Sequence, residues 1–430
     1  MQRLVHGAVR SVVALLTVTH SGCWGGGDAS TEAGSGWSGQ IRDSAGVVFV
    51  SNPEAGIWNE RSRWSAQRDL VIGAGVADRP EYEFGRIADV DAGADGRIYV
   101  LDNQAGRISV FHPDGEYAFA FGRLGQGPGE FSIDASAIRI DSDGTIAVRD
   151  GINRRDNLFT AEGAFLRTAN LSAQFRESAA LPQAGRVERA TTATWDGLLH
   201  VAADGSVIDT ITVFRYDMTR RGGALSSSGR TGRTNTIRIP LLPALPSWGV
   251  DDDGRVVAGI SSRYRIEVLR SSGALVMVID KDHDSLLMSS EAGERMLNRV
   301  RDLLRNAGLS GDAIAGVFER FTYVPPDSLP AFGDIAGGPS GTVWVQQVLP
   351  VDSMTANATV DAFDPGSAIW DVFCSDGRYL GPIALPAGFT VKKIKGSFVY
   401  GIETDDLDVQ RIVRLVIGPG EAASEDELSC

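Results

Sequence analysis

An internal repeat is the feature of this sequence that most limits the folds open to the chain. A turn dipeptide followed by a short apolar run occurs at residues 95–100, 143–148 and 253–258, and weaker copies occur at 340–345 and 395–400. Each copy has the pattern of a β-hairpin, in which a tight turn leads into a strand. A sequence that repeats one such unit predicts a repetitive all-β fold.

A second turn and an arginine recur in phase with the first turn. The second turns lie 19 residues beyond the first, at 114–115, 162–163 and 272–273, and the arginines are Arg107, Arg155 and Arg265. Residues 107–111 alternate between polar and apolar side chains, so each unit is predicted to hold four strands. Copies of such a sheet packed face to face around an axis cover one another's faces. The repeat therefore predicts a β-propeller, with the recurring arginines bonding between its strands.

Six blades follow from the length of the repeat. The first two turns are 48 residues apart, and residues 85–417, without a helical insertion at about 281–325, hold six units of that length. The predicted blades are residues 85–132, 133–180, 181–240, 241–280, 326–385 and 386–417. The third is the least regular, because its candidate turns at 195–197 and 204–205 are only eight residues apart. The sixth is short, and residues 47–50 would supply its missing strand unless they form an isolated β arm.

The residues of the first unit carry a resemblance to a known repeat. Residues 85–102 and 106–111, with the turns at 114–115 and 121–122, resemble an NHL repeat, and 125–131 is similar to the glycine-rich connection between such repeats. Further on, residues 329–332, 341–345 and 370–373 resemble a group of uncharacterised bacterial six-bladed propeller lipoproteins. The resemblance covers about 85–417 and implies an all-β, six-bladed propeller of the NHL/TolB-like class. It says little about activity, because this fold hosts many unrelated functions.

The insertion at 281–325 has helical periodicity. Ser290 is a suitable N-cap, an apolar stripe runs from Met296 to Leu304, and Gly308 ends the helix. A second short helix is predicted to begin at Asp312 and to end before Pro325. The pair fits a helical hairpin packed on the ring, and equally a lid or a docking surface, because amphipathicity does not distinguish these roles.

The first 22 residues have the pattern of a secretory signal peptide. Arg3 and Arg10 precede a short apolar run, 12–18, which is too short to span a membrane as a helix. The small residues before Cys23 resemble a bacterial lipobox, although His20 stands where that pattern prefers Leu. We therefore predict a lipid on Cys23, a flexible tether over residues 23–40 and an extracytoplasmic protein anchored at the cell envelope. Cleavage nearby without lipidation would leave it secreted.

Charge and cysteine content restrict the partners further. Forty-one basic against 55 acidic residues give a net charge of −14, which disfavours binding to nucleic acid. The propeller is predicted over 41–417 and an acidic tail over 418–430, in a monomer that meets the membrane only through its lipid anchor. Cys374 and Cys430 are an even pair that an oxidising compartment would join in a disulfide, unless they are independent residues.

No catalytic constellation is evident in the sequence. His112, His200 and His283 lack the spacing of metal ligands. Residues 141–144 and 251–254 are similar to calcium loops, but they lack the glutamate at position 12 and are better explained as turns. We predict no cofactor and lean against an enzyme, although calcium in the central channel, as in six-bladed lactonases, stays open.

The hairpin turns close one end of the predicted ring, so the remaining loops gather at the other end. Polar loops around a funnel are where propellers usually bind ligands. The candidate binding residues there are Asn103, Arg123, Asn153, Arg154, Arg263, Asp405 and Asp406. The sequence thus favours a binding or scaffold module for a protein or a saccharide. The alternatives are a lactonase-like hydrolase or lyase with a metal in the channel, and an envelope sensor or assembly component.

Overall fold

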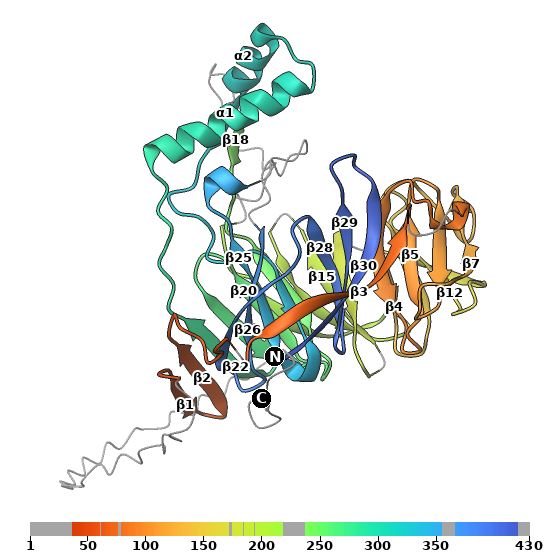
Figure 1. The fold of residues 1–430 in the computed structure, drawn as a ribbon, viewed down its shortest axis with the longest axis horizontal. Coiled ribbons are helices and arrows are strands. Elements are labelled where there is room, and N and C mark those ends of the chain that lie inside the picture. Colours follow the sequence, from red (N-terminus) through yellow and green to blue (C-terminus); the bar gives the residue numbers. More distant parts are fainter. Residues whose placement is uncertain are drawn as a thin grey trace, which may run out of the picture. The chain divides into compact units, whose positions relative to one another are not determined.

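In the described residues, five four-stranded antiparallel sheets and four antiparallel strands of a six-stranded sheet form six blades, so the predicted six-bladed β-propeller is confirmed (Figure 1). The computed structural model describes residues 37–60, 62–75, 79–171, 174–183, 185–192, 194–217, 237–354 and 366–419. The first strands of neighbouring blades contact one another, β28 with β4, β4 with β10, β10 with β14, β14 with β19 and β19 with β24. These six strands therefore surround the axis, and the later strands of each blade lie progressively further out.

The first three blades follow one another closely along the chain. Blade 1 consists of β4 (Ile87–Ala92), β5 (Ile98–Asp102), β6 (Arg107–Phe111) and β7 (Tyr117–Phe121). Blade 2 consists of β10 (Ala135–Ile140), β11 (Ile146–Asp150), β12 (Arg155–Phe159) and β13 (Phe165–Asn170). Blade 3 consists of β14 (Gln174–Ala180), β15 (Arg186–Thr191), β16 (Asp196–Val201) and β17 (Val207–Val213). Between blades 1 and 2, β8 (Arg123–Leu124) and β9 (Glu130–Phe131) form a short parallel pair.

Longer connections lie before blade 4, between blades 4 and 5 and within blade 5. Blade 4 consists of β19 (Pro246–Val250), β20 (Val256–Ile260), β21 (Arg265–Leu269) and β22 (Leu275–Lys281). Blade 5 consists of β24 (Ile335–Gly337), β25 (Val343–Val348), β26 (Gly366–Phe373) and β27 (Tyr379–Ala384). Blade 6 consists of β28 (Phe389–Lys395), β29 (Phe398–Thr404), β30 (Gln410–Pro419) and β3 (Trp64–Gly73).

The repeated Asp-Gly dipeptides are the hairpin turns that the sequence predicts. Gly96, Gly144 and Gly254 have φ of 79°, 83° and 79°, values that a residue with a Cβ rarely adopts. Blade 3 departs from the prediction, because residues 196–197 begin β16 and are not a turn. Its first turn instead contains Gly185 (φ 112°) and its second contains Gly205 (φ 92°). Its first strand, β14, begins at Gln174, so the predicted boundary at residue 181 is wrong.

The N-terminal part of the chain closes the ring, but not through residues 47–50 as predicted. β2 (Val47–Asn52), which forms a hairpin with β1 (Gln40–Ser44), pairs in parallel with β22 of blade 4. The amides of Ile57 and Trp58 then donate to the carbonyls of Tyr379 and Leu380 in blade 5, at 3.1 and 2.7 Å. β3 finally pairs with β30 and completes blade 6. One continuous segment thus follows the outer edges of three blades.

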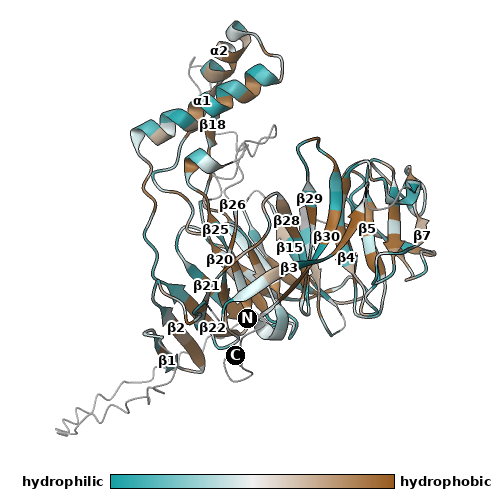
Figure 2. Ribbon diagram, viewed as in Figure 1, coloured by the Kyte–Doolittle hydropathy of each residue, from teal (hydrophilic) through white to brown (hydrophobic). Residues whose placement is uncertain are grey.

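Apolar side chains fill five of the six interfaces between blades within the described residues. Separate clusters lie between blades 1 and 2, 3 and 4, 4 and 5, 5 and 6, and 6 and 1. Figure 2 shows the apolar residues concentrated along the blade strands. The interface between blades 2 and 3 has no such cluster, and buried arginines and carboxylates occupy it instead.

The predicted helical insertion has its own small core. It contains α1 (Ser290–Asn306) and α2 (Gly311–Arg320), with Gly308 between them as predicted (Figure 1). The N-caps are Ser289 and Ser310, so the predicted starts at Ser290 and Asp312 are each late by one or two residues. β18 (Ile237–Pro240) and β23 (Phe321–Val324) form a parallel pair beside the helices. Apolar residues from four segments form the core: Leu241, Leu242, Met296, Val300, Leu329, Val351 and Met354.

Candidate functional site

Two of the predicted binding residues hold the scaffold together. Asn103 is 5% exposed, donates through Nδ2 to the carbonyl of Ala135 at 3.0 Å and accepts from Arg86 Nε at 2.8 Å. It therefore links the loop of blade 1 to the first strand of blade 2. Asn153 donates through Nδ2 to Asp150 at 2.6 Å and so fixes its own loop.

The remaining predicted residues come from separate loops. Arg123 pairs with Glu130 at 2.6 Å, and Asp405 accepts the amides of Leu407 and Val409 at 3.0 Å each, which closes the loop after β29. Arg154, Arg263 and Asp406 are exposed and form no side-chain hydrogen bond or ion pair with the described residues. They belong to blades 2, 4 and 6, and Arg263 lines a cavity of about 380 Å³.

A larger cavity lies at the opposite end, where the first hairpin turns meet the axis. Its volume is about 840 Å³, and strands or turns of blades 1, 2, 3, 4 and 6 line it. We call it the axial cavity. Its polar and aromatic wall residues are Asp95, Tyr99, Asp141, Ser142, Asp143, Asp251, Asp252, Lys393, Lys395, Phe398 and Tyr400. None of these residues was predicted as a site residue, and turn formation accounts for the aspartates beside the turn glycines.

Some charges of the axial cavity are already paired and others are available. Asp251 is buried and accepts from Arg255 Nε at 2.7 Å, and Lys395 Nζ lies 2.8 Å from Asp91. Asp143 and Asp252 have no ion pair among the described residues. Burial and the neighbouring Asp251 and Asp253 raise the pKa of Asp252, and burial lowers that of Lys395. The cavity therefore offers both hydrogen-bond acceptors and hydrogen-bond donors.

Side chains connect the axial strands to one another beside this cavity. Asp89 and Asp91 of β4 accept the amides of Ile138 and Ile140 of β10 at 3.0 Å each. Burial raises the pKa of Asp89 to about 6; burial also opposes ionisation of Asp91, but the charges of two lysines, 393 and 395, hold its pKa below the usual value. These carboxylates satisfy backbone groups that a free strand edge would leave unpaired, so we assign them a structural role.

A buried polar cluster joins blades 4 and 5, and no sequence motif indicated it. Both oxygens of Asp371 accept hydrogen bonds, from the hydroxyls of Tyr264 at 2.7 Å and Tyr379 at 2.6 Å. Lys281 Nζ lies 3.2 Å from the same carboxylate and over both tyrosine rings. Burial raises the pKa of each tyrosine, so the hydroxyls stay protonated and donate. The cluster is fully bonded and serves to tie the two blades together.

The described residues also bear on the predictions about metal ligands, membrane spans and cysteines. Within the described ranges no three His, Cys, Asp or Glu side chains lie together as metal ligands would. Neither described α-helix is long and apolar enough to span a membrane. Cys374 is buried and disulfide-bonded, and its partner lies outside the described residues. Cys23, Cys430, the signal peptide, the tether up to residue 36 and the tail beyond 419 lie outside them too.

Comparisons with known proteins agree with the architecture. A family model described as "6-bladed beta-propeller" matches residues 79–185, and a search of curated proteins gives no match. A structure from Bacteroides fragilis shares 11% identity over 87% of this chain and 100% of its own, with a TM-score of 0.49. A DUF4221-family member from Bacteroides vulgatus shares 11% identity over 84% of this chain and 100% of its own, with a TM-score of 0.47. Virginiamycin B lyase from Staphylococcus aureus shares 11% identity over 82% of this chain and 99% of its own, with a TM-score of 0.39.

Proposed function

We propose that the chain is an extracytoplasmic binding module whose ligand site is the axial cavity, and that the ligand is a small saccharide. The observation that carries the proposal is a cavity of about 840 Å³ to which five of the six blades contribute. Its volume lies within the range of small-molecule sites, ~300–1,000 Å³. A site assembled from five blades is held by the whole ring, so its geometry is fixed before a ligand arrives.

The chemistry of the wall supports a polyhydroxylated ligand. Each sugar hydroxyl both donates and accepts, and the cavity supplies acceptors at Asp143 and Asp252 and a donor at Lys393. Apolar atoms of Phe398 and Tyr400 line another part of the wall and suit the C–H face of a sugar ring. The lysines are matched by Asp91, 3.7 Å from Lys393 and 2.8 Å from Lys395, which disfavours a highly charged anion.

A saccharide panel tests the proposal. Isothermal titration of the wild-type protein with soluble hexaoses of glucose, N-acetylglucosamine and mannose should identify one that binds. Asp143→Asn combined with Asp252→Asn should weaken that binding about tenfold or more, since each charge-assisted bond becomes a neutral one. Asp406→Asn, an exposed carboxylate at the other end of the ring, is the matched control and should bind as the wild type does.

Three outcomes would replace the proposal. Binding that Asp406→Asn or Arg263→Gln reduces, and the cavity variant does not, would move the site to the opposite end. Consumption of the saccharide or of a lactone, with activity lost on chelation and restored by calcium, would make the protein a hydrolase or lyase. A panel in which no saccharide binds, together with one envelope protein captured reproducibly, would make it a scaffold or assembly component.

The proposed location rests on the N-terminal sequence. We infer that Cys23 carries the lipid and that the tether, predicted over residues 23–40, is shorter than predicted, because Gln40 begins β1 and Trp37 Nε1 donates to Asn52 Oδ1 at 3.1 Å. Labelling with a palmitate analogue should mark the wild-type chain, and Cys23→Ser should release the protein from membranes. A wild-type protein that takes up no lipid would instead be secreted after cleavage.

A further inference from the structure

The interface between blades 2 and 3 breaks the pattern of the repeat. In blade 1, Leu101 and Ile108 are opposite one another on β5 and β6, are fully buried and face blade 2. The corresponding opposite pair in blade 2 is Arg149 and Asp156, which faces blade 3. Across that interface, Arg186 and Glu188 of blade 3 take the places that Ile146 and Val148 hold in blade 2.

Packing alone does not explain these charges. Moving an ion pair out of water costs free energy, and a protein with apolar residues of similar size in its place is often equally stable or more stable. The same chain uses apolar residues at the equivalent positions of blades 1 and 2, so its repeat already contains the apolar solution. Departures from a consistent pattern concentrate at functional sites. The charged interface is therefore a candidate site in its own right.

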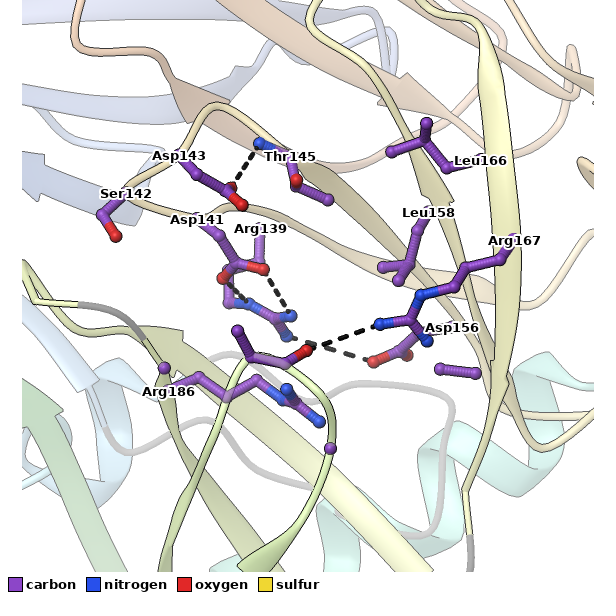
Figure 3. A pocket seen from close by; sticks show the side chains of 14 residues that line it. Arg139, Asp141, Ser142, Asp143, Thr145, Asp156, Leu158, Leu166, Arg167 and Arg186 are labelled. Carbon is purple, nitrogen blue, oxygen red and sulfur yellow. Dashed lines mark hydrogen bonds and ion pairs between the residues drawn. The ribbon is translucent and has the colours of Figure 1, made fainter.

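The carboxylates of this interface are saturated. Arg149 donates to both oxygens of Asp156, at 2.9 Å each. Arg139 donates to Oδ1 of Asp141 at 2.7 Å and to Oδ2 at 3.2 Å (Figure 3). Glu188 pairs with Arg186 through Nε. Each of these three carboxylates thus has a guanidinium partner already.

Guanidinium N–H donors remain in surplus. Nη1 of Arg149 is buried, with the side chain 4% exposed, and has no hydrogen-bond partner among the described residues. Toward the described residues, Arg186 donates through Nε and Nη1 but not Nη2, and Arg167 makes one hydrogen bond, to the carbonyl of Ala203 at 3.4 Å. Buried polar groups in native proteins normally find partners. Of these three arginines, Arg167 and Arg186 line a cavity, and their unused N–H groups are the donors available to a ligand.

A cavity of about 270 Å³ opens at this interface (Figure 3). We call it the interface cavity. Arg139, Arg167 and Arg186 line it together with Asp141, Asp143 and Asp156. Of these carboxylates only Asp143 lacks an arginine partner, and its Oδ1 accepts the amide of Thr145 at 2.9 Å. The interface cavity shares the turn 141–143 with the axial cavity but has a different lining, rich in arginine.

We propose that the interface cavity binds a small oxyanion, a carboxylate or a phosphate group, between the guanidinium groups of Arg167 and Arg186. Guanidinium presents paired N–H donors that match two oxygens of such a group, which is why arginine is the usual residue at these sites. The volume accommodates one small anion or the anionic end of a larger molecule. This site is separate from the proposed saccharide site and does not depend on it.

Thermal unfolding and titration with defined anions test the proposal. Sodium phosphate and sodium malonate should each raise Tm of the wild-type protein above its value in sodium chloride of equal ionic strength. Phosphate alone would assign a phosphate ester as ligand, and malonate alone a carboxylate. Arg186→Gln should abolish the effect. Since Arg186 is largely buried, Arg167→Gln, at an exposed residue, is the second variant and should weaken anion affinity about tenfold.

Arg154→Gln is the matched control, because Arg154 is an exposed arginine of the same blade without a side-chain bond in the described residues. It should bind the anions as the wild type does. The proposal is overturned if chloride gives the same rise in Tm as phosphate and malonate, or if Arg167→Gln binds no more weakly than Arg154→Gln. Asp252→Asn, at a residue that lines the axial cavity and not the interface cavity, should leave anion binding in place, which separates a failure here from a failure of the saccharide proposal.

Discussion

The two faces of blade 2 make a comparison within one chain. Its face toward blade 1 buries Ile146, Val148 and Phe159 in an apolar cluster. Its face toward blade 3 buries Arg149 and Asp156, which are 4% and 2% exposed. Both faces use the same strands, the same register and the same kind of neighbour, so backbone geometry does not decide between them. The difference shows that an interface between two blades can be filled by apolar or by charged residues. We therefore connect the charged interface with binding.

Breaking one member of a charge pair should have the largest effect on this comparison. Asp156→Ala leaves the buried Arg149 guanidinium without its main partner and should lower the free energy of unfolding by about 3–5 kcal/mol. Leu101→Ala, at the place in blade 1 that Arg149 takes in blade 2, should cost about 2–5 kcal/mol through lost burial and a cavity. Urea denaturation measures both.

A rescue experiment distinguishes the two causes. Adding Arg149→Leu to Asp156→Ala removes the unpaired charge and should recover most of the lost free energy of unfolding. If the second substitution leaves the loss unchanged or makes it larger, the cost of Asp156→Ala comes from packing and the two interfaces do not differ in kind.

Replacing both members of the pair with apolar residues should have a smaller effect on the free energy of unfolding, in the stabilising direction. Arg149→Leu with Asp156→Ile copies the Leu101–Ile108 pair into blade 2 and is expected to be neutral or to stabilise by about 1–4 kcal/mol. The reverse graft, Leu101→Arg with Ile108→Asp, is the control and should destabilise, because it places the pair in the apolar cluster between blades 1 and 2. A converted protein that unfolds well before the wild type would mean that the charges are needed for folding.

The sequence was informative about the ring and less so about its sites. The turns around Gly96, Gly144 and Gly254 need glycine because their φ angles are positive. They therefore indicate hairpins in the sequence without any tertiary information. The closing strand β3 was missed because Gln67, Arg68 and Asp69 interrupt its apolar pattern, although its ends pack into two clusters. A strand recruited from the far end of the chain is decided by pairing, which no local pattern encodes.

The candidate sites were missed for a related reason. Asp143 and Asp252 stand next to turn glycines, where turn formation already accounts for an aspartate. That the same turns bring carboxylates to one cavity depends on how five blades are arranged. A signal for the blade 2–3 interface was present: Arg149 and Asp156 are charged where the first unit has Leu101 and Ile108. Comparing the copies position by position, rather than only for their turns, exposes it.

The smallest expected difference between the two interfaces is their response to acid. Burial opposes ionisation of Asp156, but hydrogen bonds and the charge of Arg149 hold its pKa below the usual value. The unfolded chain, with a carboxyl pKa of about 3.9, binds more protons at this residue. Its contribution to stability is therefore complete above that value and is lost as the pH falls through the lower folded pKa. Urea denaturation at pH 7, 5, 4 and 3 should show a steeper loss in the wild type than in Arg149→Leu with Asp156→Ile, while Leu101→Ala follows the wild type. Equal losses in wild type and converted protein would show that the pair contributes nothing pH-dependent.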